Sequence, residues 1–234
     1  GSFGSLDGRL FNDEVNFDRD WIDHARRYFT NIVGKYGPFV QHLLKKAATI
    51  YIKMICPLHG PVWRNDFGYI LDKYDKWSRY EPEEKGVIIV YASMYGNTEY
   101  AAQTLASHLV DKGLTNVRVY DVSNTHVSYL IAETFRVSHV VIAGVTFNLG
   151  IYPNMLNYLH DMKALNLQNR TFAILENGSW APKSGSLTQK FLDEEMKMIN
   201  VLDDPYTITT AMTKTNEMDI AAMADATIPS VNQG

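Results

Sequence analysis

The chain has 234 residues, of which 46% are hydrophobic and 21% charged, so it can bury a substantial core and is not expected to be disordered. Its 22 Lys and Arg against 26 Asp and Glu give a net charge of −4, which excludes an overall basic field for nucleic acid or an anionic membrane. The single cysteine, Cys56, excludes an internal disulfide, and no apolar run reaches the roughly 20 residues that span a bilayer. We therefore expect a cytoplasmic protein that binds neither nucleic acid nor membrane.

The first part of the chain is predicted to be mostly helical. Apolar residues recur at helical spacing over 18–33, 39–48 and 66–77, and Gly34 is expected to end the first of these helices. Between the second and third lies Ile55-Cys56-Pro57-Leu58-His59-Gly60-Pro61, whose Pro and Gly residues should hold His59 in a fixed backbone setting. Three tryptophans are expected to anchor a core or an interface: Trp21, Trp63 and Trp77.

A change in charge balance marks the boundary between two segments. Residues 1–85 carry a net charge of +1, and residues 86–234 carry a net charge of −5. The stretch 81–86, Glu-Pro-Glu-Glu-Lys-Gly, lies at this change. It is the expected linker between a domain over 1–80 and a second domain over 87–234.

The second domain alternates short apolar runs with stretches of helical periodicity. The runs are Val87–Ala92, Val117–Val122, His139–Ala143, Thr171–Leu175 and Tyr206–Thr209, and the helical stretches are 96–112, 127–135, 154–165, 187–199 and 216–226. Runs without polar alternation predict strands that helices cover on both faces. The predicted fold class is α/β, with a doubly wound five-stranded parallel sheet. Function is expected in the loops after the carboxyl ends of its strands.

The loop after the first strand is Ser93-Met94-Tyr95-Gly96-Asn97-Thr98, which runs directly into a helix. The first N–H groups of a helix are unpaired and its dipole is positive there, so these groups and nearby hydroxyl and amide side chains can hold a phosphate without Lys or Arg. The sequence lacks the Gly-Lys-Ser/Thr of a nucleotide triphosphate loop and the Gly-x-Gly-x-x-Gly of a dinucleotide loop. A terminal phosphomonoester fits better. The alternative is that Asn97 or Ser93 simply caps the helix.

Two further loops combine aromatic, small and amide side chains. They are Gly144-Val145-Thr146-Phe147-Asn148-Leu149-Gly150-Ile151-Tyr152-Pro153 after the third strand and Glu176-Asn177-Gly178-Ser179-Trp180-Ala181-Pro182 after the fourth. A flat heteroaromatic ring needs an apolar face to stack on and backbone groups at its edge, and glycine lets the backbone come close. The three loops together predict a phosphorylated flat cofactor. Taken alone, Trp180 could equally be a surface aromatic residue or a packing anchor.

These loops resemble those of the flavodoxin family, and the match covers residues 86–226. The similarity is closer still to the flavodoxin-like half of flavodiiron proteins, the A-type flavoproteins. This resemblance implies the strand order 2-1-3-4-5 and FMN as cofactor, with the phosphate on residues 93–98 and the isoalloxazine ring between 146–150 and 177–180. The implied cofactor-binding residues are Ser93, Met94, Tyr95, Gly96, Asn97, Thr98, Thr146, Phe147, Asn148, Leu149, Gly150, Asn177, Gly178, Ser179 and Trp180.

The segment before the linker resembles the closing part of the metallo-β-lactamase-like domain that precedes flavodoxin in flavodiiron proteins. The similar strings are Gly4-Ser5-Leu6-Asp7-Gly8-Arg9-Leu10-Phe11 and Pro57-Leu58-His59-Gly60-Pro61. The resemblance implies that His59 is an iron ligand, although the family's other ligands would lie upstream of Gly1. One imidazole cannot hold two irons, so a di-iron centre is expected only if upstream residues are present. The missing initiator Met also suggests a piece of a longer protein.

The resemblance implies that the chain is the FMN electron-transfer portion of a flavodiiron protein, which reduces oxygen or nitric oxide when its di-iron domain is complete. Electrons would come from a rubredoxin-like protein or a flavin reductase, and a head-to-tail homodimer would bring the flavin of one subunit near the irons of the other. The apolar faces of the N-terminal helices also favour dimerisation. No set of nucleophile, base and orienting group is found, so no catalytic residue is assigned.

Three alternatives belong to other classes of protein. A stand-alone flavodoxin-like electron shuttle with a vestigial N-terminal segment would have a genuine start near Gly1. A signalling receiver would need an Asp at the end of the third strand, where Gly144-Val145-Thr146 stands. A hydrolase remnant of the metallo-β-lactamase type would need metal ligands that this sequence does not contain.

Overall fold

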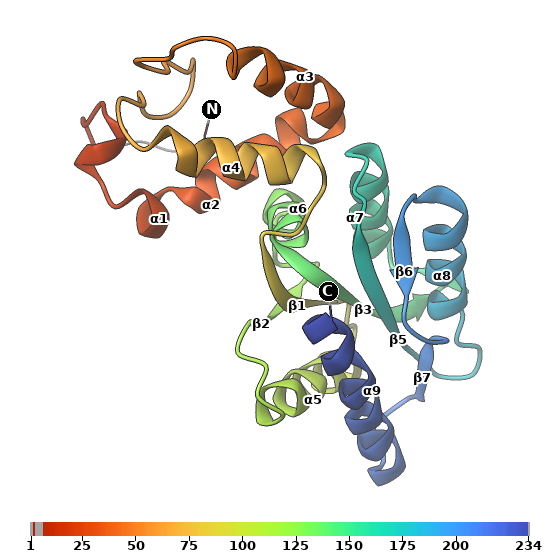
Figure 1. Ribbon diagram of the computed structural model, residues 1–234. Coiled ribbons are helices and arrows are strands. Elements are labelled where there is room, and N and C mark those ends of the chain that lie inside the picture. The colour runs from red at the N-terminus through yellow and green to blue at the C-terminus, as the bar shows by residue number, and fades with distance from the viewer. Residues whose placement is uncertain (1, 3–6, 234) are drawn as a thin grey trace.

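The computed structural model describes residues 2 and 7–233, which form two packed parts (Figure 1). The first part is mostly helical, as its periodicity predicted. Its elements are η1 (Asn12–Glu14), α1 (Phe17–Asp20), α2 (Ile22–Tyr28), the π-helix η2 (Phe29–Val33), η3 (Gly34–Tyr36), α3 (Gly37–Ala47) and α4 (Phe67–Ser78). The three tryptophans predicted as anchors, Trp21, Trp63 and Trp77, are buried in one core between these helices.

The prediction that Gly34 ends the first helix is wrong. The chain remains helical through Gly34, whose φ is −48°, and continues through η3 into α3. Gly34 instead lies in a contact between the two parts of the molecule. Its carbonyl oxygen accepts a hydrogen bond of 2.9 Å from the Tyr80 hydroxyl, and a Cβ at this position would lie 3.5 Å from the Phe135 ring. The last of these distances is an ordinary van der Waals contact, so the glycine is not required here for lack of space.

The second part is built on a parallel sheet. Its strands are β1 (Glu84–Tyr91), β2 (Val117–Asp121), β3 (Val137–Phe147), β4 (Gly150–Ile151), β5 (Arg170–Gly178), β6 (Ile199–Val201) and β7 (Tyr206–Thr209). The order is β2-β1-β3-β5-β6, with β7 also paired to β5 and β4 paired to β3. Only the β3–β4 pair is antiparallel among the described strands. The five predicted strands correspond to β1, β2, β3, β5 and β7, and their order 2-1-3-4-5 is confirmed because β6 and β7 share the fifth position. The sheet has seven strands rather than the predicted five, since β4 and β6 are additional short strands.

Five helices cover the two faces of this sheet: α5 (Asn97–Asp111), α6 (Val127–Arg136), α7 (Pro153–Ala164), α8 (Ser184–Glu195) and α9 (Lys214–Gln233). Alternate residues of β1 enter two separate cores. Ile88 and Val90 pack with α6 and α7, whereas Val87 and Ile89 pack with α5 and α9. The predicted burial of the strands on both faces is confirmed. Among the described helices, none has the length and apolar character needed to cross a membrane.

Several predicted boundaries differ from the structure, among them the ends of β5 and α9, and two others are wrong for a common reason. The helix predicted over 187–199 ends at Glu195, and Ile199 begins β6 instead. The strand predicted to end at Ala143 continues to Phe147, where β3 turns back into β4. In both cases a neighbouring strand supplies the hydrogen bonds, Arg170 of β5 being the partner of Ile199. A pattern along one segment does not reveal such a partner.

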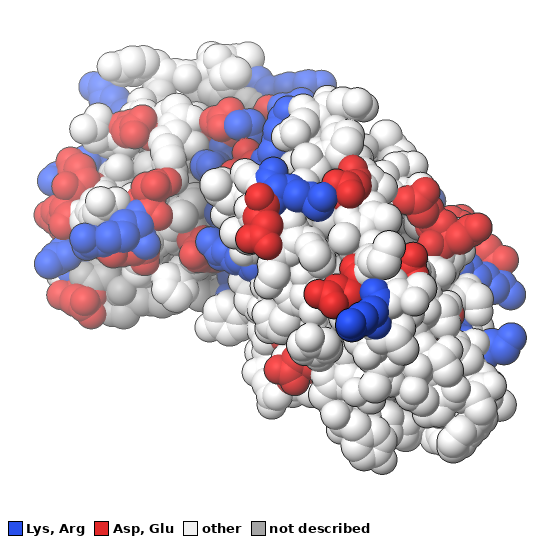
Figure 2. Space-filling model, turned by 90° about the horizontal axis from the view of Figure 1, so that it is seen from below, with Lys and Arg blue, Asp and Glu red and all other residues white. Residues whose placement is uncertain are grey.

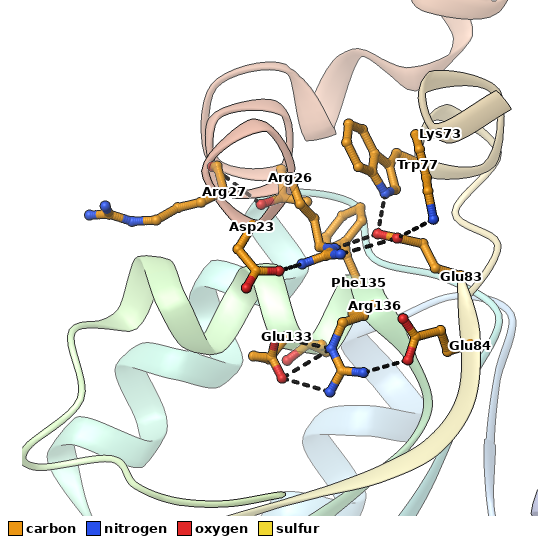
Figure 3. A network of polar contacts seen from close by, with 12 residues as sticks. Asp23, Arg26, Arg27, Lys73, Trp77, Glu83, Glu84, Glu133, Phe135 and Arg136 are labelled. Atoms are coloured by element: carbon orange, nitrogen blue, oxygen red, sulfur yellow. Dashed lines mark hydrogen bonds and ion pairs between the residues drawn. The ribbon is translucent and has the colours of Figure 1, made fainter. Parts of the chain in front are cut away.

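The helical part and the sheet meet at the start of β1. β1 begins at Glu84, within the range 81–86, and the preceding residue, Glu83, points back into the helical part (Figure 3). The Glu83 carboxylate accepts hydrogen bonds from three side chains of that part: Arg26 of α2 and Lys73 and Trp77 of α4. The junction is therefore held by buried polar contacts.

Candidate functional site

The loops that follow β1, β3 and β5 leave the sheet at one edge, because these strands are parallel neighbours. Near this edge Tyr91 is paired with Ala143, and Val145 with Asn177. The strands run toward the lower side of Figure 1, so the view from below in Figure 2 looks onto this edge. The lower right of that view is largely free of charged side chains. An anionic ligand at this edge would meet backbone and neutral groups rather than cations.

The first loop, Ser93–Thr98, presents the start of α5. Gly96 precedes the helix with a φ of +87°, in the left-handed region that favours glycine, and its N–H donates to Ser93 Oγ over 3.0 Å. The described residues provide no side-chain cap for α5, so the alternative of a simple cap by Ser93 or Asn97 is not supported. The N–H groups of the first turn are thus available to an anion. Thr98 is buried, whereas Met94 and Tyr95 are exposed.

The second loop is the turn of a hairpin. Thr146 pairs with Ile151, and Phe147 with Gly150, so Asn148 and Leu149 form the tip with φ angles of +48° and +59°. Thr146 has a structural role as well, because its Oγ1 accepts hydrogen bonds from the N–H groups of Lys183 and Ser184 at 2.9 and 3.1 Å. The hairpin is thereby joined to the start of α8.

The third loop, at the end of β5, is narrow at its base. A Cβ on Gly178 would lie 2.9 Å from Pro182 Cα, so a larger residue would force the two sides of the loop apart. The Asn177 side chain donates to the carbonyl oxygen of Thr210 over 2.7 Å and is buried. Ser179 is exposed, and Trp180 at the tip has an exposed fraction of 93%. Trp180 is therefore not the packing anchor that the sequence left open.

A pocket of about 240 Å³ lies between the second and third loops. Its lining residues are Thr146, Asn148, Leu149, Ser179, Trp180 and Ala181. Residues of the first loop are not part of this lining, although that loop follows the adjacent strand β1. The structure thus brings five of the sequence-predicted residues to one pocket and leaves the other predicted residues in the loops around it.

Three groups behind the pocket were not among the predicted site residues. They are the Glu176 carboxylate of β5 and two hydroxyl groups that donate to it. One hydroxyl belongs to Ser184 of α8 and the other to Thr207 of β7. Glu176 was visible as an acidic residue within an otherwise neutral loop. Nothing in the sequence indicates the other two, because they approach Glu176 only through the fold.

His59 lies apart from this edge, in the helical part. It is exposed, and its ring centroid is 5.7 Å from that of Tyr28. Within the described residues no three His, Cys, Asp or Glu side chains are grouped as a metal site. Of the string 4–11, residues Gly4, Ser5 and Leu6 lie outside the described residues.

Comparison with known proteins identifies the second part of the chain. Residues 89–198 match the model of the flavodoxin family. These residues form a flavodoxin domain. FMN is therefore the cofactor expected at this site, and the residues of the site are compatible with its phosphate and its ring. The uncapped start of α5 offers N–H groups to a phosphate, and the pocket beside Trp180 offers an indole face and backbone groups to a flat ring.

Similar sequences extend beyond this flavodoxin domain. An uncharacterized protein of Methanocaldococcus jannaschii is 32% identical over 144 residues, which is 62% of this chain and 36% of that protein. The anaerobic nitric oxide reductase flavorubredoxin of Aeromonas salmonicida is 28% identical over 178 residues, which is 74% of this chain and 34% of that protein. The chain is homologous to the flavorubredoxins, and it spans about a third of the length of these relatives.

Solved structures share the fold of both parts together. Rubredoxin oxygen:oxidoreductase from Desulfovibrio gigas superposes with a TM-score of 0.90 at 23% identity, over 100% of this chain and 58% of that one. The flavodiiron protein from Giardia intestinalis gives a TM-score of 0.90 at 22% identity, with the same coverage. At these identities the likeness establishes the fold, including the helical part that precedes the flavodoxin domain.

Proposed function

We propose that this chain is the FMN-binding, electron-transfer portion of a flavodiiron protein. Bound FMN supplies the redox chemistry, while the protein binds, orients and shields it. The observation that carries the proposal is the pocket at the carboxyl edge of the flavodoxin domain, next to the uncapped start of α5. That the helical part and the flavodoxin domain together match flavodiiron structures supports the larger assignment.

We further propose how FMN lies in this site. The N–H groups at the start of α5, with Ser93 and Thr98 nearby, hold the phosphate. The ring lies in the pocket between the hairpin tip and Trp180, whose exposed indole is free to stack on it. Phe147, Gly150, Asn177 and Gly178 shape the two loops around the ring. With no Lys or Arg in residues 93–98, 144–153 or 176–182, amide contacts and stacking hold the cofactor.

The activity of the whole protein is a separate proposal. In a longer protein, electrons would pass from a rubredoxin-like donor or a flavin reductase through FMN to a di-iron site that reduces oxygen or nitric oxide. The names of the oxygen- and nitric oxide-reducing relatives support this. His59 would supply one iron ligand, and the remaining ligands would come from residues that this chain does not contain. A cytoplasmic location follows from the same proposal.

A homodimer is part of the proposal. The helical part exposes several large apolar side chains, including Phe39, Leu43 and Leu58 with exposed fractions of 75%, 62% and 97%. Association would remove this surface from water. We expect sedimentation velocity at micromolar concentration to give a dimer, and a monomer throughout that range would contradict this.

Titration with FMN tests the site directly. We expect the purified chain to bind FMN and become yellow, and Trp180→Ala to weaken binding by about fivefold, since stacking on an aromatic ring contributes about 1 kcal/mol. Tyr51→Ala is the matched control, because Tyr51 is 88% exposed but lies in the helical part. Absence of FMN binding by the unaltered chain would refute the proposed function. Equal affinity of the two variants would refute the position of the ring.

A further inference from the structure

We propose that Glu176 is a positioning residue of the FMN site, with two effects. Its carboxylate fixes the two loops that hold the ring, and its buried negative charge lowers the reduction potential of bound FMN. The inference rests on the proposed function, since it concerns the same site. Glu176 lies near the end of β5, is the first residue of the third loop, and is 6% exposed.

The contacts of Glu176 join three elements. Its Oε2 accepts a hydrogen bond of 2.7 Å from the Gly185 N–H in the first turn of α8, and Oε1 accepts one of 2.8 Å from the Thr207 hydroxyl of β7. The Ser184 hydroxyl lies 3.4 Å from Oε2. Both carboxylate oxygens therefore have donors, which a buried carboxylate requires. The end of β5, the start of α8 and β7 are held together at this single group.

The approach of α8 to this carboxylate depends on glycine. A Cβ on Gly185 would lie 2.8 Å from Glu176 Cδ and 2.8 Å from Pro205 Cβ, so a side chain there would push the helix away. With glycine, the N–H of the first turn reaches the carboxylate. The helix start is thus capped by residues far away in sequence.

The same helix start is bound to the other ring-holding loop. Thr146 in the hairpin accepts hydrogen bonds from the N–H groups of Lys183 and Ser184. The next N–H along the chain, that of Gly185, donates to Glu176. Thr146 also lines the pocket. The start of α8 is therefore a common support for the hairpin and for the loop that carries Trp180, and Glu176 and Thr146 fix the spacing between them.

The charge on Glu176 is balanced only partly. Its described partners are hydroxyl groups and a helix N-terminus, whose dipole contributes a fraction of a positive charge, and no described Lys or Arg forms an ion pair with it. Reduction adds negative charge to FMN. A buried carboxylate three residues before the pocket-lining Ser179 opposes that charge more strongly than an exposed one would, because the interior screens less than water.

Two variants separate charge from packing. Glu176→Gln keeps the shape, and its amide can accept from Gly185 while donating to the Thr207 hydroxyl. Thr207→Val keeps the charge but removes one of its donors. We expect dye-coupled reductive titration of the FMN-loaded protein to give a higher midpoint potential for E176Q and a lower one for T207V. A purely structural role would not give shifts of opposite sign.

A third variant tests the positioning of the loops. Thr146→Val removes the acceptor for two N–H groups, so we expect FMN to bind about tenfold more weakly while the apoprotein retains its far-UV circular dichroism. Glu195→Gln, at the exposed opposite end of α8, is the control and should leave affinity and potential unchanged.

The outcomes are distinguishable from failure of the proposed function, which would appear as no FMN binding by the unaltered chain. Unchanged potentials in E176Q and T207V, with FMN bound, would overturn the charge effect alone. Unchanged FMN affinity in T146V would overturn the support by α8. Should E176Q not fold, the sign of the T207V shift still decides the charge effect.

Discussion

Replacing Arg170 by methionine is expected to lower the free energy of unfolding by about 3 kcal/mol or more. Arg170 begins β5 and is 2% exposed. Its guanidinium donates at 2.6 to 3.1 Å to the backbone carbonyl oxygens of Tyr80, Thr134, Phe135, Gln168 and Asn169. Methionine would fill much of the space but would leave these oxygens without their donor. Unsatisfied buried acceptors, rather than a cavity, are the cause of the expected loss.

The position of Arg170 explains why so many donors are needed there. Thr134 and Phe135 belong to the last turn of α6, where carbonyl groups have no partner within the helix and the dipole is negative. Tyr80 ends the helical part of the molecule. Burial lowers the pKa of Arg170 to about 9, and the nearby charge of Glu83 and the Tyr158 side chain oppose this shift. One side chain thus joins the end of α6, the start of β5 and the junction between the two parts.

Urea unfolding followed by circular dichroism measures this effect. Arg19→Met is the matched control, because Arg19 is 74% exposed and pairs only with an exposed Asp20, so its loss should cost less than about 1 kcal/mol. A shift of the unfolding midpoint that is equally small in both variants would show that the carbonyl oxygens find other donors.

The sequence predicted those features of the fold that depend on local periodicity. Apolar runs located the strands, and helical spacing located α5, α6, α7 and α9. It could not predict β6, which exists because the edge of β5 pairs with Ile199. It also missed that the chain stays helical through Gly34, whose carbonyl oxygen accepts a hydrogen bond from the distant Tyr80. These errors arise where a partner distant in sequence decides the conformation.

In the candidate site, too, local features could be predicted from the sequence and contacts between distant residues could not. Its three loops are continuous strings, so glycine, amides and an aromatic residue could be recognised in each. The support behind them joins Thr146, Glu176, Ser184 and Thr207, which lie on β3, β5, α8 and β7. No spacing in the sequence relates these residues. The sequence therefore indicated the loops that border the pocket but not the residues that hold these loops in place.

Replacing Glu83 by glutamine is expected to destabilise the protein by about 3 to 5 kcal/mol near neutral pH. The Glu83 side chain is 0% exposed and accepts hydrogen bonds from Arg26, Lys73 and the indole N–H of Trp77 (Figure 3). Arg26 is itself only 3% exposed. An amide offers one acceptor atom in place of two, and its NH₂ group would face donors. The variant would also leave two cations without a buried counter-charge.

The loss should depend on pH in a defined direction. Burial by itself raises the pKa of Glu83, but the hydrogen bonds and charge of Arg26, with Lys73, hold that pKa below the ordinary value. A carboxyl group whose pKa is lower in the folded protein stabilises it above the unfolded pKa, near 4.5, and loses this contribution as the pH falls through the folded pKa. The difference in stability between the unaltered protein and E83Q should therefore be largest near pH 7 and shrink below pH about 4.

Urea unfolding of both proteins at pH 7 and at pH 3 tests this expectation. Glu81→Gln is the control within the same linker, because Glu81 is 41% exposed and pairs with Arg79 at the surface. We expect E81Q to change stability by less than about 1 kcal/mol at either pH. If the difference in unfolding free energy between the unaltered protein and E83Q were the same at both pH values, the charge of Glu83 would not be its cause. The shape and uncharged hydrogen bonding of the side chain would then hold the helical part on the flavodoxin domain.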